Sequence, residues 1–70
     1  MEGKVDMVSA GKIMRELRGI RTRTGVSREM KIPYSTLQSY EDGRREPAGK
    51  TKERIAEYYG VPVEVIFFEQ

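Results

Sequence analysis

The sequence predicts a compact all-α domain of five short helices, and three observations support this expectation. Apolar residues recur three and four positions apart, which is the spacing of one helix face. Residues that cap or break helices lie between these segments. No segment has the alternating pattern of a strand of convincing length. Seventy residues are enough for one domain with a small core.

The first helix is expected to begin at Ser9, whose hydroxyl can cap it. Residues 1–8 show no clear period and are expected to form a flexible N-terminal tail, so the domain would span residues 9–70. The helix would end before Gly19. Its buried face would consist of Ile13, Met14 and Leu17.

Two further helices are expected over about residues 22–30 and 33–41. Thr22 is a suitable N-cap for the first of them. Pro33 is tolerated in the first turn of a helix and would begin the second, which Gly43 would end. The residues expected to face inward are Val26, Met30, Leu37 and Tyr40.

The remaining helices are expected after a polar connection that contains Pro47. The fourth runs from about residue 50 to 59 and is closed by Gly60. Pro62 could open a short last helix. This last segment carries Val65, Ile66, Phe67 and Phe68.

Positive charge is concentrated in the middle of the chain. Residues 9–54 hold twelve of the thirteen Lys and Arg residues and six acids, which gives about +6, whereas residues 55–70 come to −3. Such a field favours a polyanionic partner, although an ordinary solvated surface could also be rich in charge. The segment from Thr22 to Pro47 adds two helices joined by a three-residue turn, with polar and aromatic residues on the outer face of the second. Double-stranded DNA is therefore the partner that the sequence favours.

A resemblance to a known family rests on four motifs. They are RELR (Arg15–Arg18), YEDGRREP (Tyr40–Pro47), IAEYYGV (Ile55–Val61) and VEVIFF (Val63–Phe68). With these motifs, residues 11–68 resemble the Xre-type, lambda-repressor-like helix-turn-helix domain. The resemblance implies a sequence-specific transcription regulator of bacteria, phages or mobile elements, often dimeric. We expect a homodimer that represses by occupying a pseudo-palindromic operator.

Several residues depart from the pattern of this family. Lys31 occupies the position in the turn that usually holds Gly or Asn, where a left-handed backbone costs roughly 1 kcal/mol without glycine. Arg23 stands where Gln is common, and Ser27 replaces the usual Ala. Pro33 and Pro62 stand where the family often has a capping Ser.

The geometry of a helix-turn-helix domain indicates which residues contact DNA. The side chains expected at base edges are Tyr34, Ser35, Gln38 and Ser39. Gln38 can form two hydrogen bonds with adenine, worth about 1–3 kcal/mol of discrimination. For the two serines the alternative is a solvated face, and for Tyr34 it is packing against a neighbouring helix. The cations expected at phosphates are Arg23, Lys31, Arg44, Arg45 and Lys50.

Other residues are expected to have structural roles. The family pattern implies structural roles for Glu41 and Arg18, which could pair with one another within the fold. The aromatic residues near the C-terminus are more than a small core readily hides, so an exposed patch is expected there. The residues expected at the dimer interface are Ile66, Phe67 and Phe68.

Several classes of function are disfavoured. The chain has no Cys and no His, which excludes disulfides and the usual thiolate or imidazole metal sites. No cofactor and no enzyme activity are expected, because no cluster of carboxylates, phosphate-binding loop or activated nucleophile is visible. No apolar run approaches the length of a membrane span, so a cytoplasmic protein is expected. The alternative function is a protein-interaction module, such as an anti-repressor or antitoxin-like partner, that uses the aromatic C-terminal surface.

Overall fold

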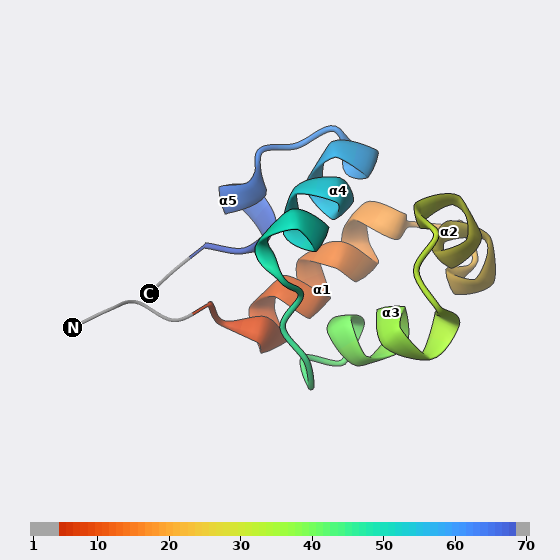
Figure 1. Ribbon diagram of the computed structural model, residues 1–70, viewed down its shortest axis with the longest axis horizontal. Helices are drawn as coiled ribbons and strands as arrows, with labels where there is room; N and C mark the ends of the chain where they lie inside the picture. Colours follow the sequence, from red (N-terminus) through yellow and green to blue (C-terminus); the bar gives the residue numbers. More distant parts are fainter. Residues whose placement is uncertain (1–4, 69–70) are drawn as a thin grey trace.

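The computed structural model describes residues 5–68 and confirms the all-α class, with five helices (Figure 1). They are α1 (Met7–Arg18), α2 (Arg23–Met30), α3 (Tyr34–Glu41), α4 (Gly49–Tyr59) and α5 (Val63–Ile66). Helix α1 lies in the middle and packs against α3 on one side and α5 on the other (Figure 1). Helix α2 contacts α3 and α4. No helix in residues 5–68 is long and apolar enough to cross a membrane.

The expected start of the first helix at Ser9 is wrong, because α1 begins two residues earlier. Asp6 is the N-cap, and its carboxylate accepts hydrogen bonds from the backbone N–H of Ser9 at 3.2 Å and from the Ser9 hydroxyl at 2.8 Å. A carboxylate has two oxygens for these donors, so Asp6 caps the helix and Ser9 becomes its third residue. Of the expected tail, Met7 and Val8 therefore belong to α1, and residues 1–4 lie outside the described residues.

The two helices expected over residues 22–30 and 33–41 are confirmed, with small differences at their ends. The hydroxyl of Thr22 caps α2 by accepting a hydrogen bond from the N–H of Gly25 at 3.0 Å. Lys31 ends α2 with φ 60° and ψ 42°, and no other non-glycine residue in residues 5–68 has a positive φ. Pro33 occupies the N-cap position of α3 rather than its first turn. The backbone of Lys31 in this turn is therefore left-handed, a conformation that glycine would adopt at a lower steric cost.

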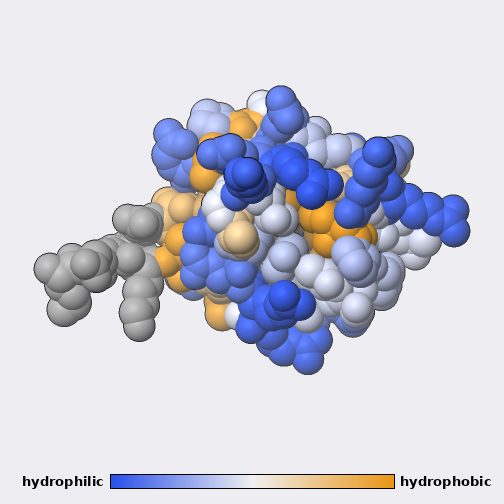
Figure 2. Space-filling model, viewed as in Figure 1, coloured by the Kyte–Doolittle hydropathy of each residue, from blue (hydrophilic) through white to orange (hydrophobic). Residues whose placement is uncertain are grey.

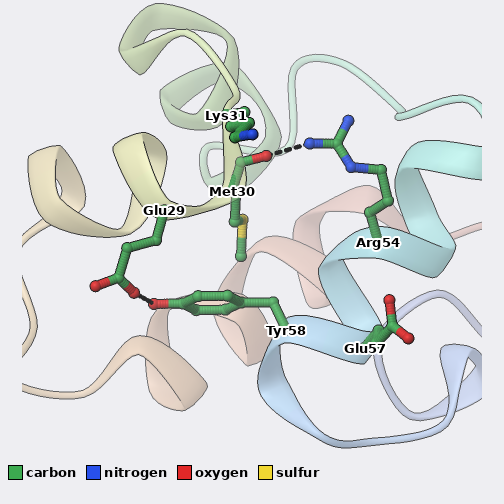
Figure 3. Close-up of a pocket in the computed structure, with 6 residues that line it drawn as sticks. All are labelled: Glu29, Met30, Lys31, Arg54, Glu57 and Tyr58. Carbon is green, nitrogen blue, oxygen red and sulfur yellow. Dashed lines mark hydrogen bonds between the residues drawn. The ribbon is translucent and has the colours of Figure 1, made fainter.

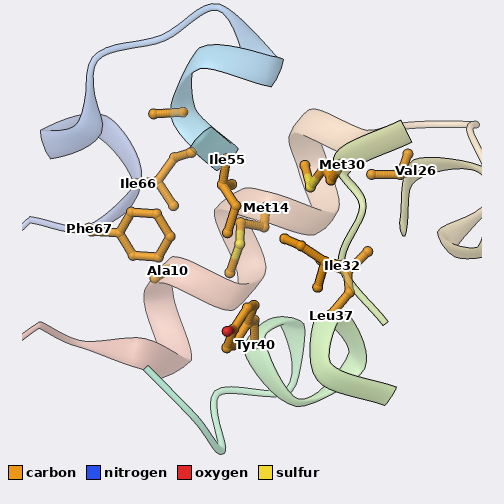
Figure 4. Close-up of a cluster of buried hydrophobic side chains, with 11 residues drawn as sticks. Ala10, Met14, Val26, Met30, Ile32, Leu37, Tyr40, Ile55, Ile66 and Phe67 are labelled. Atoms are coloured by element: carbon orange, nitrogen blue, oxygen red, sulfur yellow. The ribbon is translucent and has the colours of Figure 1, made fainter. Parts of the chain in front are cut away.

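The core draws side chains from all five helices (Figure 4). Its buried members are Ala10, Met14, Val26, Met30, Ile32, Leu37, Tyr40, Ile55, Ala56, Ile66 and Phe67. The expectation of an exposed patch at Ile66 and Phe67 is wrong, because they are 0% and 4% exposed. Helix α5 packs onto α1 and α4, and this packing takes both side chains into the core. Phe68 remains half-buried.

Candidate nucleic-acid interface

The outer face of α3 carries the four residues expected to contact bases. Tyr34 is 46% exposed and Ser35 is exposed, whereas Gln38 and Ser39 are half-buried. Within residues 5–68, the side chains of Ser35, Gln38 and Ser39 have no hydrogen-bond partner. Their donors and acceptors are therefore free to bind other groups, and the hydrogen-bonding edges of bases suit them chemically.

A fully buried carboxylate lies at the C-terminal end of α3. Glu41 is 0% exposed, and Arg18 donates to it from Nε at 3.1 Å and from Nη2 at 3.2 Å. Arg23 donates to it from Nε at 2.9 Å. A buried charge without partners would be costly, and here it has two cations and three hydrogen bonds. The expected pairing of Glu41 with Arg18 is confirmed.

The pairing of Glu41 with Arg23 was not predicted from the sequence. Arg23 is the first residue of α2, and its side chain is only 19% exposed. Its guanidinium carbon also lies 5.8 Å from the centre of the Tyr34 ring. Burial alone would lower the pKa of Arg23, but its interactions with Glu41 and Tyr34 outweigh burial and raise that pKa. A phosphate contact by Arg23 stays a prediction, and the structure shows that this cation already has partners on α3.

The other four expected phosphate contacts, Lys31, Arg44, Arg45 and Lys50, are exposed. Arg44 forms an ion pair with Asp42, with Nη2 and Oδ2 3.1 Å apart. This pair lies at the surface, where such pairs contribute little, so Arg44 can exchange it for another anion at small cost.

Helix α2 is held on its other side by α4 (Figure 3). Arg54 donates from Nη2 to the carbonyl of Met30 at the C-terminal end of α2, and the Tyr58 hydroxyl donates to Glu29 (Figure 3). A cation at a helix C-terminus also complements the helix dipole. These contacts were not predicted from the sequence, although the four-residue spacing of Arg54 and Tyr58 places them on one face of α4. They fix α2 relative to the core and so support the helix pair.

The arrangement is that of a helix-turn-helix unit: two short helices at a three-residue turn, the second with a free polar face. A family model described as "Helix-turn-helix" matches residues 12–66. The chain belongs to the helix-turn-helix family. The match confirms the resemblance to the Xre-type, lambda-repressor-like domain, and with it the class of DNA-binding transcription regulators.

Two solved structures share the helix-turn-helix fold. The restriction-modification controller protein C.AhdI from Aeromonas hydrophila superposes with a TM-score of 0.77 and 20% identity, over 89% of this chain and 97% of that chain. The DNA-binding domain of BldD superposes with a TM-score of 0.74 and 24% identity, over 89% of this chain and 93% of that chain. No curated protein matches the sequence significantly. At these identities the two structures establish the helix-turn-helix fold.

Proposed function

We propose that this helix-turn-helix protein is a sequence-specific regulator that places α3 in the major groove of double-stranded DNA. The observation that carries the proposal is the free polar face of α3, on which Ser35, Gln38 and Ser39 have no partner in residues 5–68. The major groove is wide enough for a helix and presents a distinct donor and acceptor pattern for each base pair. Gln38 suits adenine, the serines suit either kind of base, and the Tyr34 ring suits a sugar or a thymine methyl.

Phosphate contacts supply most of the affinity in this proposal. Lys31, Arg45 and Lys50 are exposed, and their side chains form no ion pair within residues 5–68. Arg44 exchanges Asp42 for a phosphate. Each cation that reaches a phosphate releases a counterion, so affinity falls as salt increases.

We propose further that the regulator acts as a homodimer and a repressor in the cytoplasm. Two copies of α3 in successive major grooves, about 34 Å apart, would read a pseudo-palindromic operator and exclude polymerase from a promoter. Because Ile66 and Phe67 are buried in one chain, the surface proposed for the dimer is Val65, which is 46% exposed, with Phe68. A twofold axis would bring these residues against their copies.

A second candidate function is the binding of a partner protein by the C-terminal surface. A groove lies there between α4, α5 and the start of the described chain, and it favours this candidate because four of its six lining residues are apolar. It is lined by Val5, Lys52, Val63, Glu64, Phe67 and Phe68. Figure 2 shows that apolar surface in this view is confined to separate patches among hydrophilic side chains.

Amide chemical shifts of the ¹⁵N-labelled protein, followed during addition of a 20-base-pair duplex of mixed sequence, distinguish the two candidates. DNA binding by α3 predicts the largest shifts in α3, in residues 31–33 and in the loop before α4. A homodimer that forms on DNA would add shifts in α5. No shift in α3 even at low salt would exclude the DNA proposal and turn attention to the C-terminal groove.

A further inference from the structure

We propose that Arg23 is a positioning residue that orients the Tyr34 ring and thereby sets the base preference where Tyr34 contacts DNA. The inference rests on the proposed docking of α3 in the major groove. It assigns to Arg23 a role in specificity, in place of the purely electrostatic role that a cation at a phosphate would have.

The two ends of α3 present partners to Arg23 on one face of the helix. Tyr34 is the first residue of α3 and Glu41 the last, and their separation of seven positions is close to two turns, which take about 7.2 residues. The Arg23 side chain lies along this face, with Nε 2.9 Å from Glu41 Oε1 and its guanidinium carbon 5.8 Å from the Tyr34 ring centre. One side chain of α2 therefore contacts both ends of the recognition helix.

Glu41 fixes the guanidinium before any ligand is present. The carboxylate is fully buried and is itself held by Arg18, so it cannot follow Arg23 to a new position. The Arg23 side chain is 19% exposed, which leaves it little freedom. Because the carboxylate is fixed, the guanidinium bound to it is held in one position.

The orientation of the Tyr34 ring depends on the position of the Arg23 guanidinium. The ring projects from the first turn of α3, the residue is 46% exposed, and the Arg23 guanidinium is its cation–π partner within residues 5–68. A cation within about 6 Å of a ring centre is attracted to the ring face. Arg23 therefore selects one ring orientation among those open to an exposed tyrosine, and this lowers the entropy lost when the ring packs on a base or sugar.

Arginine suits this role better than lysine does. The planar guanidinium can donate from its edge to a carboxylate while its face lies on an aromatic ring, whereas an ammonium is a point charge that does neither with the same geometry. Arg23→Lys therefore keeps the positive charge beside Glu41 and removes the planar guanidinium beside the Tyr34 ring. The substitution separates positioning from charge.

The experiment is a selection from duplex DNA with a 20-base-pair randomised segment, sequenced after binding to four proteins. They are the wild type, Arg23→Lys, Tyr34→Leu and the double variant. We expect the two single variants to lose base preference at the same positions, by about two- to fivefold, which is the value of a cation–π contact at an exposed site. The double variant should lose no more than Tyr34→Leu alone, because the two residues act as a unit.

Salt dependence on the selected wild-type site provides the second measurement. A positioning residue leaves the slope of log affinity against log salt unchanged in Arg23→Gln, whereas loss of a phosphate contact makes that slope shallower by about one. The matched control is Arg45→Gln, which removes an exposed cation. This control should make the slope shallower and leave the selected sequence the same.

Three results overturn the inference. In the first, the wild type selects a sequence and Arg23→Lys selects it with undiminished preference. In the second, Arg23→Lys alters positions other than those altered by Tyr34→Leu. In the third, Arg23→Gln makes the salt slope shallower as Arg45→Gln does. If the wild type instead binds no duplex at low salt, the proposed function is excluded, and the inference is excluded with it.

If Arg23→Lys does not fold, a comparison of Tyr34→Phe with Tyr34→Leu still tests the inference. Tyr34→Phe keeps the ring on which the guanidinium lies, and Tyr34 is exposed enough for the fold to tolerate either change. The inference then requires Tyr34→Phe to retain the base preference that Tyr34→Leu loses. Equal loss in the two variants would show that the ring and its orientation are irrelevant.

Discussion

Gly11 of α1 lies directly against the backbone of Glu41, the last residue of α3. A Cβ atom on Gly11 would be 2.2 Å from the carbonyl oxygen of Glu41 and 3.0 Å from that of Tyr40. The same Glu41 carbonyl accepts a hydrogen bond from Arg15 Nη2 at 2.8 Å, so it cannot move away without loss. The position of the recognition helix therefore depends on the absence of a side chain at Gly11.

Gly11→Ala is expected to destabilise the protein by about 2–3 kcal/mol, because the three atoms that the new methyl group meets all belong to the backbone. For a domain of this size the melting temperature should fall by roughly 10–20 °C. Circular dichroism during heating measures the change. The matched control is Gly49→Ala, since a Cβ there meets nothing within 4 Å. The control should be neutral or slightly stabilising, and an equal loss in both variants would contradict the account.

Lys31→Gly is expected to stabilise the protein by about 0.5–1 kcal/mol. Lys31 has φ 60° and ψ 42°, a conformation that glycine adopts without the steric cost that a Cβ imposes. Urea unfolding at constant m-value measures the gain. The opposite substitution, Gly60→Ala, places a Cβ at φ 71° in otherwise open space and should cost a similar amount. Destabilisation by Lys31→Gly would show that the lysine side chain contributes contacts that outweigh the strain.

Glu41→Ala is expected to cost about 3 kcal/mol or more, because it leaves Arg18 and Arg23 facing a buried site without an anion. Chemical denaturation gives the free energy of unfolding. Asp42→Ala is the control, since it removes the acid of the exposed pair with Arg44 and should cost less than about 1 kcal/mol. If the two substitutions lower the free energy of unfolding equally, the buried ion pairs of Glu41 contribute no more to stability than the surface pair does.

Alkaline pH should reveal the burial of Tyr59. Burial raises the pKa of Tyr59 to about 12 in the folded protein, and its hydroxyl has no partner in residues 5–68. In the unfolded chain the same group loses its proton near pH 10. Between these values the folded state binds more protons, so its stability decreases as pH rises and is fully retained only below pH 10.

The matched variant for this pH dependence is Tyr59→Phe. It cannot ionise, so its free energy of unfolding should fall less between pH 10 and 12 than that of the wild type, by roughly 2 kcal/mol. At pH 7 the variant should be at least as stable, because it buries no unpaired hydroxyl. Parallel curves for the two proteins over this pH range would exclude Tyr59 as the source of the alkaline loss.

Local signals explain which parts of the fold could be predicted from the sequence. Thr22 and Gly60 act through their own backbone neighbours, so the ends of α2 and α4 followed from residue type and spacing. The start of α1 was missed because Asp6 and Ser9 are both capping residues, and only the structure shows which one accepts the bonds. Competition between neighbouring caps is not resolved by residue type alone.

The candidate site could be predicted only in part, because its geometry depends on contacts between distant residues. The outer face of α3 followed from helical spacing. The pairing of Arg23 with Glu41 joins residues 18 positions apart, and nothing in the local pattern predicts it. The burial of Ile66 and Phe67 likewise depends on how α5 packs onto α1, which composition does not specify.

Docking of α3 on duplex DNA amid phosphate-binding cations can be measured by a fluorescence-anisotropy titration of labelled mixed-sequence duplex at several salt concentrations. The Arg44→Ala, Arg45→Ala double variant is measured alongside. We expect log affinity to fall linearly with log salt, at about 0.9 per phosphate contact, and the slope to be shallower by about two in the variant. Absence of binding at low salt, or identical slopes for the two proteins, would contradict this docking.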